Sequence, residues 1–319
     1  MARVLEDSML PTTTLFRATD ARSLPDVPNP TRAVRNHARA ALVKIAGTPI
    51  SAAIGITAQV TTSLVLVRAE LSIAVLAMVL CVAVGSYAID HLVDEGKAAG
   101  ARRWARGSGM AALLLVTAAL VAYALRGAVA AAITIVFPLS VAAYCMPWLG
   151  VIPALRRRGI ARVKDIPYAK NAYTALCVAG AAVWAATTVG VHDARVLVAQ
   201  GLAMSLSAFV NTAACDLGDV DADRRDGVPT LAVRHGRHHA SRILLVIAVC
   251  WSVVVAVGTW GGLFAPAGWL IAPCVVVVAA TLARLGRGAN VTLLADVLPD
   301  GTDAFVAFVA LIARHVLGG

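Results

Sequence analysis

Long intervals without a single charged residue dominate this chain of 319 residues and limit what it can fold into. Hydrophobic residues make up 59% of the sequence and charged residues only 14%, whereas a soluble domain has about 25% charged residues. A soluble fold of this length could not cover so much apolar surface. The composition therefore excludes a cytosolic enzyme, a disordered chain and a disulfide scaffold, and it predicts an integral membrane protein.

The charge-free intervals predict an all-α, polytopic membrane protein with nine transmembrane helices. Crossing the hydrocarbon core takes about 20 helical residues. Six intervals have room for one helix each: 45–67, 71–89, 107–125, 127–155, 171–191 and 196–215. The interval 243–283 is long enough for two helices joined by a turn at Gly261 and Gly262, and 303–319 is the shortest candidate. Residues 1–40 are polar, which predicts a disordered cytosolic arm before a membrane domain over 41–319.

Basic residues gather in alternate loops, and this pattern predicts the orientation of the chain. They precede the first predicted helix and follow the second, fourth, sixth and eighth, while the opposite loops hold few. Because cytoplasmic loops are enriched in Lys and Arg, we expect the N-terminus to be cytosolic and the C-terminus to lie outside. The net charge of +10 then reflects these loops and anionic lipid, and no nucleic-acid partner is expected. High Ala, Val and Arg usage suggests a bacterial plasma membrane.

Eight of the 18 acidic residues fall in two short runs at predicted cytosolic helix ends. The runs consist of Asp90, Asp94 and Glu95, and of Asp216, Asp219, Asp221, Asp223 and Asp226. Side chains three or four residues apart share one face of a helix, so each run predicts a row of carboxylates. A carboxylate pair at a helix end is commonly a solvated face, but five acids within eleven residues are harder to explain in that way.

Rows of like charge are mildly destabilising by themselves, and a divalent cation would reverse this effect. Carboxylate oxygens suit Mg²⁺, which keeps waters and completes its coordination with substrate phosphates. Two acidic faces that meet across a cavity, with Lys and Arg nearby, would form a site for a metal-bridged diphosphate. A cation transporter is a distant alternative, since transporter carboxylates usually lie near the bilayer midplane.

The second run resembles the second aspartate-rich motif of the UbiA superfamily of membrane prenyltransferases. Asp219 and Asp223 match the DxxxD pair of that motif, Asp216 matches the acid before it, and the tail from Gly227 to Thr230 is similar as well. The resemblance covers roughly residues 40–319. It implies a ring of helices around a central cavity, Mg²⁺ as cofactor and a prenyl diphosphate as substrate.

The first run is similar to the first motif of this family, NxxxDxxxD. Asp90 and Asp94 match, whereas Ser86 replaces the usual Asn and Tyr87 replaces an Asp found in many members. The resemblance thus implies the following roles. The metal ligands are Asp90, Asp94, Asp216, Asp219 and Asp223, and the catalytic carboxylates are Asp90, Asp94, Asp219 and Asp223. Ser86 is an expected contact of the diphosphate.

The loop before residue 171 resembles a basic loop of the family. Lys164 and Lys170 are the expected diphosphate contacts, with Arg162 behind them. Tyr144 matches a tyrosine often found at the end of the fourth helix of the family, and the resemblance implies that it contacts the diphosphate. Trp148 stands where the family often has a basic residue four positions later.

Two enzymatic functions stay open on the sequence. The family ionises an allylic diphosphate, and an acceptor, often an aromatic ring, then attacks the cation. Members with altered first motifs include terpene cyclases, in which a double bond of the same molecule quenches the cation. Because Ser86 and Tyr87 depart from the first motif, a terpene cyclase stays open as an alternative to a prenyltransferase. Asn211, a polar residue inside a predicted helix, is explained either by function or by helix–helix hydrogen bonding.

Overall fold

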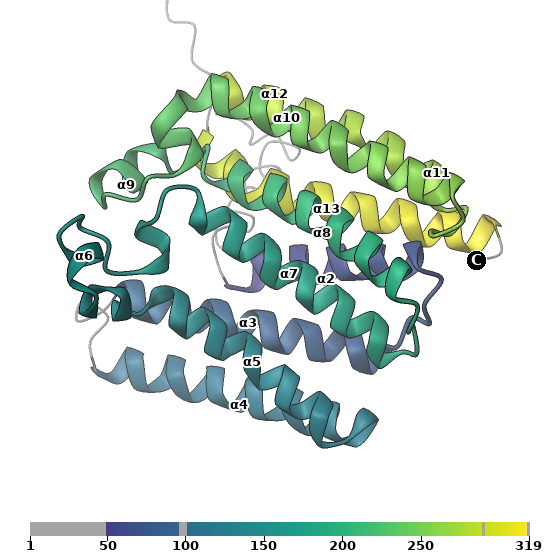
Figure 1. Cartoon of the computed structure of the whole chain (residues 1–319), viewed down its shortest axis with the longest axis horizontal. Coiled ribbons are helices and arrows are strands. Elements are labelled where there is room, and N and C mark those ends of the chain that lie inside the picture. Colours follow the sequence, from purple (N-terminus) through teal and green to yellow (C-terminus); the bar gives the residue numbers. More distant parts are fainter. Residues whose placement is uncertain (1–48, 96–100, 289–290, 318–319) are drawn as a thin grey trace, which may run out of the picture. The chain divides into compact units, whose positions relative to one another are not determined.

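The computed structural model of the chain describes residues 49–95, 101–288 and 291–317. Within these ranges every regular element is a helix, as Figure 1 shows. The long helices are α2 (Pro49–Leu66), α3 (Ile73–Glu95), α4 (Ala101–Arg126), α5 (Ala128–Cys145), α7 (Ala169–Thr188), α8 (Ala194–Cys215), α10 (Leu231–Trp260), α12 (Val275–Gly286) and α13 (Val291–Leu317). The short ones are η2 (Trp148–Val151), α6 (Pro153–Arg156), η3 (Val163–Asp165), α9 (Val220–Arg225), α11 (Gly268–Ile271) and η4 (Ala272–Cys274). The predicted arm over 1–40 lies outside the described residues.

Six segments are long and apolar enough to cross a membrane: Ile73–Val93, Arg106–Arg126, Ala128–Cys145, Ala194–Cys215, Leu231–Trp260 and Gly268–Gly286. The prediction of a helical, polytopic membrane protein is confirmed. The count of nine stays a prediction, because α2 is short and α7 and α13 are not among these segments. The sequence of α13 contains several acidic residues, which interrupt its apolar stretch.

The predicted helix over 127–155 is shorter than its charge-free interval. Helix α5 ends at Cys145, and Met146 is extended, with φ −76° and ψ 146°. Pro147 follows, and a proline disfavours the helical conformation of the residue before it. The chain then continues through η2 and α6 rather than as one transmembrane helix, so the prediction of a single helix over this interval is wrong in its second half.

Helices far apart in the sequence pack closely in the bundle. Helix α13 packs along α2, α7 along α8, and α8 also contacts α10, as can be followed in Figure 1. Alanines line these contacts, among them Ala182, Ala203 and Ala310, each with 0% exposure. Small side chains let helix backbones approach closely where lipid offers no hydrophobic driving force.

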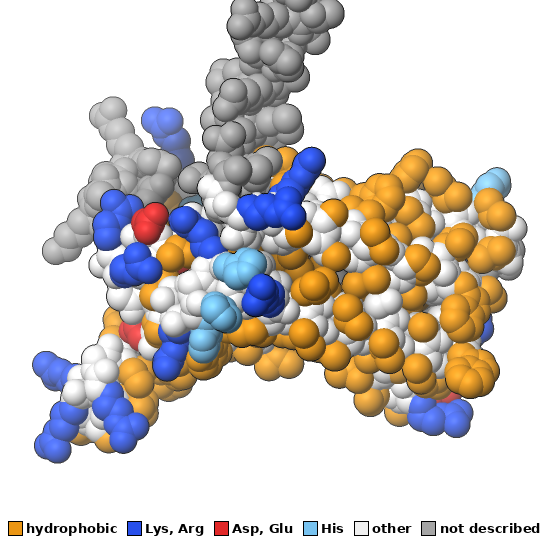
Figure 2. Space-filling model, turned by 90° about the horizontal axis from the view of Figure 1, so that it is seen from above, with side chains coloured by type: hydrophobic (Ala, Val, Ile, Leu, Met, Phe, Trp, Pro, Cys, Tyr) orange, Lys and Arg blue, Asp and Glu red, His pale blue; other side chains and the backbone are white. Residues whose placement is uncertain are grey.

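Charge gathers at one end of the bundle, where α6 and α9 lie in Figure 1. Figure 2 shows Lys, Arg and His side chains there, while hydrophobic side chains cover most of the remaining visible surface. The exposed basic residues include Arg156, Arg157, Arg158, Arg224 and Arg234. The connection η2–α6–η3 at this end leads into α7, and α9 follows α8; α7 and α8 both carry residues of the predicted site.

Candidate active site

A cavity of about 280 Å³ receives residues of both aspartate runs. Asp90 reaches it from α3, and Asp216 and Asp219 reach it from the end of α8, although more than a hundred residues separate the runs. The other polar side chains in its wall are Ser51, Gln59, Tyr87, His91, Tyr144, Lys170, Asn171, Thr174, Asn211, Thr212, Cys215 and Asp300. The two acidic runs therefore meet at one site.

The second aspartate run lies on a turn and a short helix rather than on one continuous helix. Helix α8 ends at Cys215, and the amide of Gly218 donates to the Cys215 carbonyl at 2.9 Å. Helix α9 begins after Asp219. The prediction that Asp216, Asp219 and Asp223 share one continuous helix face is thus wrong. The physical reason is this tight turn at a glycine, a poor helix former.

Lys170, at the start of α7, brings the carboxylates of this run together. Its Nζ donates to Asp216 Oδ1 at 2.7 Å and lies 3.4 Å from Asp223 Oδ1. The neighbouring Asn171 donates from Nδ2 to the other oxygen of Asp216, Oδ2, at 2.8 Å. Helix α7 therefore presents a cation and an amide to the turn after α8. Among the described residues, the ion pairs of Asp216 and Asp223 are both with Lys170.

The electrostatics of this cluster follow from burial. Burial disfavours the charged form of Lys170, but the carboxylates of Asp216 and Asp223 outweigh this effect and raise its pKa above the ordinary value. Burial also raises the pKa of Asp223 to about 6, with Lys170 opposing the shift and Asp216 adding to it. The pKa of Asp219 is raised for the same reasons. The cluster has more negative charge than Lys170 can compensate, as a cation site requires.

The first aspartate run lies on the last turns of α3. Asp90 faces the cavity, and the Cys145 thiol at the end of α5 donates to its Oδ1 at 2.7 Å. The Ser86 hydroxyl is buried without a hydrogen-bond partner among the described residues. The backbone of Asp94 belongs to α3, but its side chain lies outside the described part of the structure.

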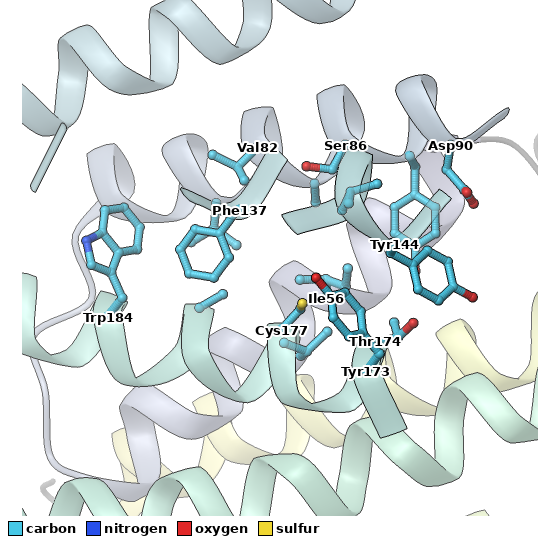
Figure 3. Close-up of a pocket in the computed structure, with 16 residues that line it drawn as sticks. Ile56, Val82, Ser86, Asp90, Phe137, Tyr144, Tyr173, Thr174, Cys177 and Trp184 are labelled. Atoms are coloured by element: carbon cyan, nitrogen blue, oxygen red, sulfur yellow. The ribbon is translucent and has the colours of Figure 1, made fainter. Parts of the chain in front are cut away.

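An apolar pocket of about 110 Å³ adjoins the polar cavity. The two share wall residues Ile56, Tyr87, Asp90, Tyr144, Thr174 and Val178. Figure 3 shows the pocket running between α3 and α7 from Asp90 and Tyr144 at one end to Trp184 at the other, with Phe137 in between. The Tyr144 and Tyr173 rings stack with centroids 5.2 Å apart. The polar cavity is suited to the charged head of an elongated ligand, and the apolar pocket is suited to its apolar tail.

The remaining basic residues of the predicted site lie elsewhere in the loop before α7. Arg162 donates from Nη2 to Asp165 Oδ1 at 2.9 Å, within the loop itself. Lys164 is buried, with 7% exposure. Of the three predicted diphosphate contacts in this loop, Lys170 alone belongs to the described wall of the cavity. Direct contact of Arg162 or Lys164 with a ligand stays a prediction.

Asp300 on α13 is a wall residue that the sequence analysis missed. The signal was present, because Asp296, Asp300 and Asp303 have the same spacing of four and three as the motifs. The predicted last helix, however, begins only at residue 303, because the acidic residues before it interrupt the apolar pattern. Helix α13 begins at Val291 instead, and this places the acidic residues inside a helix.

The carboxylate and amide oxygens described for the site are suited to a hard cation, but they are not close enough together to coordinate one as they stand. The part of the structure with described side chains, which excludes Asp94, contains no group of three acidic, His or Cys side chains close enough to hold a metal. Asp223 Oδ2 and Asn171 Oδ1 are nevertheless buried without a hydrogen-bond partner among the described residues. Buried oxygens of this kind are costly unless they bind a donor or a cation, so the site is suited to Mg²⁺.

Comparison with solved structures identifies the fold. A UbiA homologue from Aeropyrum pernix K1 aligns with a TM-score of 0.62 and 12% identity, over 84% of this chain and 98% of that one. This chain has the UbiA fold. A UbiA homologue from Archaeoglobus fulgidus bound to DMAPP and Mg²⁺ aligns with a TM-score of 0.52 and 13% identity, over 84% and 97%. A structure of digeranylgeranylglyceryl phosphate synthase gives 0.52 and 15%, over 84% and 93%.

The resemblance to the UbiA superfamily is thereby confirmed at the level of the fold. No protein-family model and no curated protein sequence matches the chain. The UbiA fold surrounds a site whose residues come from α2, α3, α5, α7, α8 and α13.

Proposed function

We propose that this chain is an Mg²⁺-dependent intramembrane prenyltransferase. It would ionise an allylic prenyl diphosphate and transfer the prenyl group to an acceptor, aromatic or another nucleophile. The observation that carries the proposal is the shared wall of the two cavities. Asp90, Asp216 and Lys170 line the polar one, which continues past Tyr144 into an apolar pocket that ends at Trp184.

Mg²⁺ would be held by carboxylates of both runs and by the diphosphate. Asp90, Asp94, Asp216, Asp219 and Asp223 are the proposed ligands, in support of which the Archaeoglobus fulgidus homologue was solved with DMAPP and Mg²⁺. When bound, the metal supplies charge stabilisation for the departing diphosphate.

The residues of the chain have separate tasks in this proposal. Lys170 and Asn171, which hold Asp216, would donate to the charged head with their remaining N–H groups. Preorganised donors of this kind stabilise the charge that develops on a leaving group. The pocket behind them excludes water from the allylic cation. The faces of the stacked Tyr144 and Tyr173 rings, 5.2 Å apart, are suited to stabilising positive charge.

A UbiA-type terpene cyclase is the second candidate function. The apolar pocket favours it, because five aromatic residues, Tyr87, Phe137, Tyr144, Tyr173 and Trp184, belong to its wall. Aromatic faces stabilise cations along a folded chain. In this case the prenyl diphosphate would be the sole substrate, and a double bond of the same molecule would take the place of the acceptor.

We further propose that the site opens toward the cytosol of a bacterial plasma membrane. The concentration of Lys and Arg at the end where α6 and α9 lie supports this orientation, since basic residues are enriched on the cytoplasmic side. The N-terminus would share that side, and the C-terminus would lie outside.

The test is release of inorganic diphosphate by the purified protein in lipid nanodiscs. We expect Mg²⁺-dependent release from an allylic prenyl diphosphate, and its loss in Asp90→Ala and Asp219→Ala. Asp221→Ala is the matched control, because Asp221 belongs to the same acidic run but has 76% side-chain exposure. Ion flux without prenyl turnover would indicate the transporter alternative instead. A cyclic hydrocarbon formed without acceptor would indicate the cyclase.

A further inference from the structure

Helix α13 adds a carboxylate that belongs to neither aspartate motif. Asp300 lines the polar cavity together with Tyr87 of α3 and Asp216 after α8. Helix α13 is held in this position by its packing against α2 and α8. The carboxylate therefore reaches the cavity from a helix that carries neither aspartate motif.

The surroundings of Asp300 are built to accommodate it. Gly55 of α2 leaves the room for the carboxylate, since a Cβ added there would collide with Asp300 Oδ1. Asn211 of α8 donates from Nδ2 to Asp303 Oδ2 at 2.5 Å, and the same nitrogen lies 3.5 Å from Asp300 Oδ1. Three helices thus fix the position of this side chain.

A second buried polar group points into the same cavity. Gln59 of α2 donates from Nε2 to Asp303 Oδ2 at 2.7 Å, which fixes its amide. Its Oε1 is buried without a hydrogen-bond partner among the described residues, and Gln59, with 4% exposure, lines the cavity. An amide oxygen oriented in this way lacks a donor, and a ligand in the cavity could supply one.

Both candidate reactions need a base. Transfer to an aromatic ring ends with loss of a ring proton, and cyclisation ends with loss of a proton from the cyclised cation. Asp216 is a poor base for this step, because Lys170 and Asn171 already donate to both of its oxygens. The other motif carboxylates are proposed metal ligands, and a metal competes with protons for such groups.

We propose that Asp300 is the base that accepts this proton, an inference that rests on the proposed function. The C1–O bond of the prenyl diphosphate breaks, and its electron pair leaves with the diphosphate. A π pair of the acceptor, or of the prenyl chain itself, forms the new carbon–carbon bond. The resulting cation loses a proton to the Asp300 carboxylate, which restores the aromatic ring or leaves an alkene. The protonated carboxyl then releases its proton to water.

The test separates ionisation from proton removal in Asp300→Asn. We expect the variant to release diphosphate at nearly the wild-type rate, since the Mg²⁺ and diphosphate contacts are intact. Formation of the prenylated or cyclised product should fall by about 100-fold, the contribution typical of a positioned base. The difference should appear as an alcohol. Water would capture either the allylic cation, after reversal of the new carbon–carbon bond, or the cyclised cation, and would lose a proton to solvent. A primary deuterium isotope effect on product formation, from label at the carbon that loses the proton, should become larger than in the wild type.

An unchanged ratio of product to diphosphate in Asp300→Asn would overturn the proposal. An equal loss of diphosphate release and of product formation would also overturn the proposal, because it would assign Asp300 to the departure of diphosphate. If Asp300→Asn does not fold, Gly55→Ala displaces the carboxylate without removing it and should lower the same ratio, and an unchanged ratio there counts against the proposal. Absence of diphosphate release from the wild type is a different result, since it contradicts the proposed function itself.

Discussion

Lys170 is the residue on which the charge balance of the site depends. It donates to Asp216 and lies near Asp223, and both carboxylates are nearly buried. We predict that Lys170→Met lowers the free energy of unfolding in the absence of Mg²⁺ by about 3 kcal/mol, because it leaves buried carboxylates without their cation. The rise of Tm on addition of Mg²⁺ should be larger than in the wild type, because the metal then replaces the lysine.

The control for this variant is Arg195→Met at the other end of α8. Arg195 is 83% exposed and pairs with Asp193 at 3.3 Å, and a surface pair of this kind is worth about 1 kcal/mol or less. A smaller effect of Mg²⁺ on the Tm of Lys170→Met than on that of the wild type would contradict the prediction. Thermal unfolding in detergent or nanodiscs, with and without Mg²⁺, provides the measurement.

The raised pKa of Asp223 predicts how Mg²⁺ binding depends on pH. Its pKa is raised to about 6, mainly by burial, and Mg²⁺ requires the deprotonated form. We expect Mg²⁺ affinity at pH 5 to be about tenfold lower than at pH 7.5, since one proton then competes with the metal. Titration of the metal by calorimetry at both pH values measures the difference. Asp223→Asn should reduce the pH dependence, and an equal dependence in that variant would show that another group controls it.

The raised pKa of Asp223 also affects the stability of the metal-free protein, which should decrease as the pH rises. A carboxyl whose pKa is higher in the folded than in the unfolded state favours folding in its protonated form. The stabilisation is fully present below the unfolded value of about 3.9. It is lost as the pH rises toward about 6, the value in the folded state. Without Mg²⁺, we therefore expect the contribution of Asp223 to stability to decrease between these pH values.

At the scale of the elements, the shape of α10 is set by one glycine. Gly236 has φ 76° and ψ 155° inside the helix, so a short turn after Thr230 is joined to the long apolar part at an angle. This backbone conformation is essentially restricted to glycine, and another residue in such a region costs about 1–3 kcal/mol. We predict that Gly236→Ala destabilises the protein by this amount and lowers diphosphate release, because α9 and the second aspartate run precede this turn.

Gly109 offers the matched control for that substitution. It lies inside α4, is exposed, and a Cβ added there meets nothing within 4 Å. Alanine is a better helix former than glycine by about 1 kcal/mol, so Gly109→Ala should leave stability unchanged or raise it. Equal effects of the two substitutions would contradict the role assigned to Gly236. Unfolding transitions of both variants, compared with the wild type, decide between these outcomes.

The sequence predicted helix ends well where charges or paired glycines mark them, and poorly at a single proline. The turn at Gly261 and Gly262 was expected, and α10 ends at Trp260 just before it. The end of α5 was missed, since it depends on Pro147 and not on a charge. Asp300 was missed for the converse reason, because a carboxylate inside a membrane helix interrupts a charge-free interval. A carboxylate inside a membrane helix is tolerated only where it faces a cavity or has hydrogen-bond partners. The sequence pattern does not reveal these surroundings.

The site itself was only partly predictable for a similar reason. Spacing identified the residue types of both runs, and Asp90, Asp216 and Asp219 do line one cavity. The ion pair of Lys170 with Asp216, 46 positions away, depends on how α7 packs along α8. Likewise, Arg162 and Lys170 have the same charge in the sequence, but the contact of Arg162 with Asp165 within its own loop distinguishes them. Contacts of this kind arise from packing and not from local pattern.

At the scale of the whole molecule, the proposed function predicts that the apolar pocket limits the length of the prenyl chain. It runs from Asp90 to Trp184 between α3 and α7, so a prenyl chain with its diphosphate at the polar end would extend toward Trp184. Ala181 belongs to the pocket wall. We predict that Ala181→Phe shortens the longest prenyl diphosphate that the protein accepts, because the ring occupies the space of the distal isoprene units. Competition among prenyl diphosphates of increasing length, measured by kcat/KM, gives the preferred length.

Leu176→Phe on the same helix is the control, since Leu176 is 66% exposed on the outside of α7. It adds comparable bulk to the helix without entering the pocket. Overpacking at Ala181 also costs about 1–3 kcal/mol of stability, and a general loss of stability would lower kcat/KM for every chain length alike. A selective loss for long chains is therefore the decisive result. A uniform loss in Ala181→Phe, or the same selectivity in Leu176→Phe, would show that the chain is accommodated elsewhere.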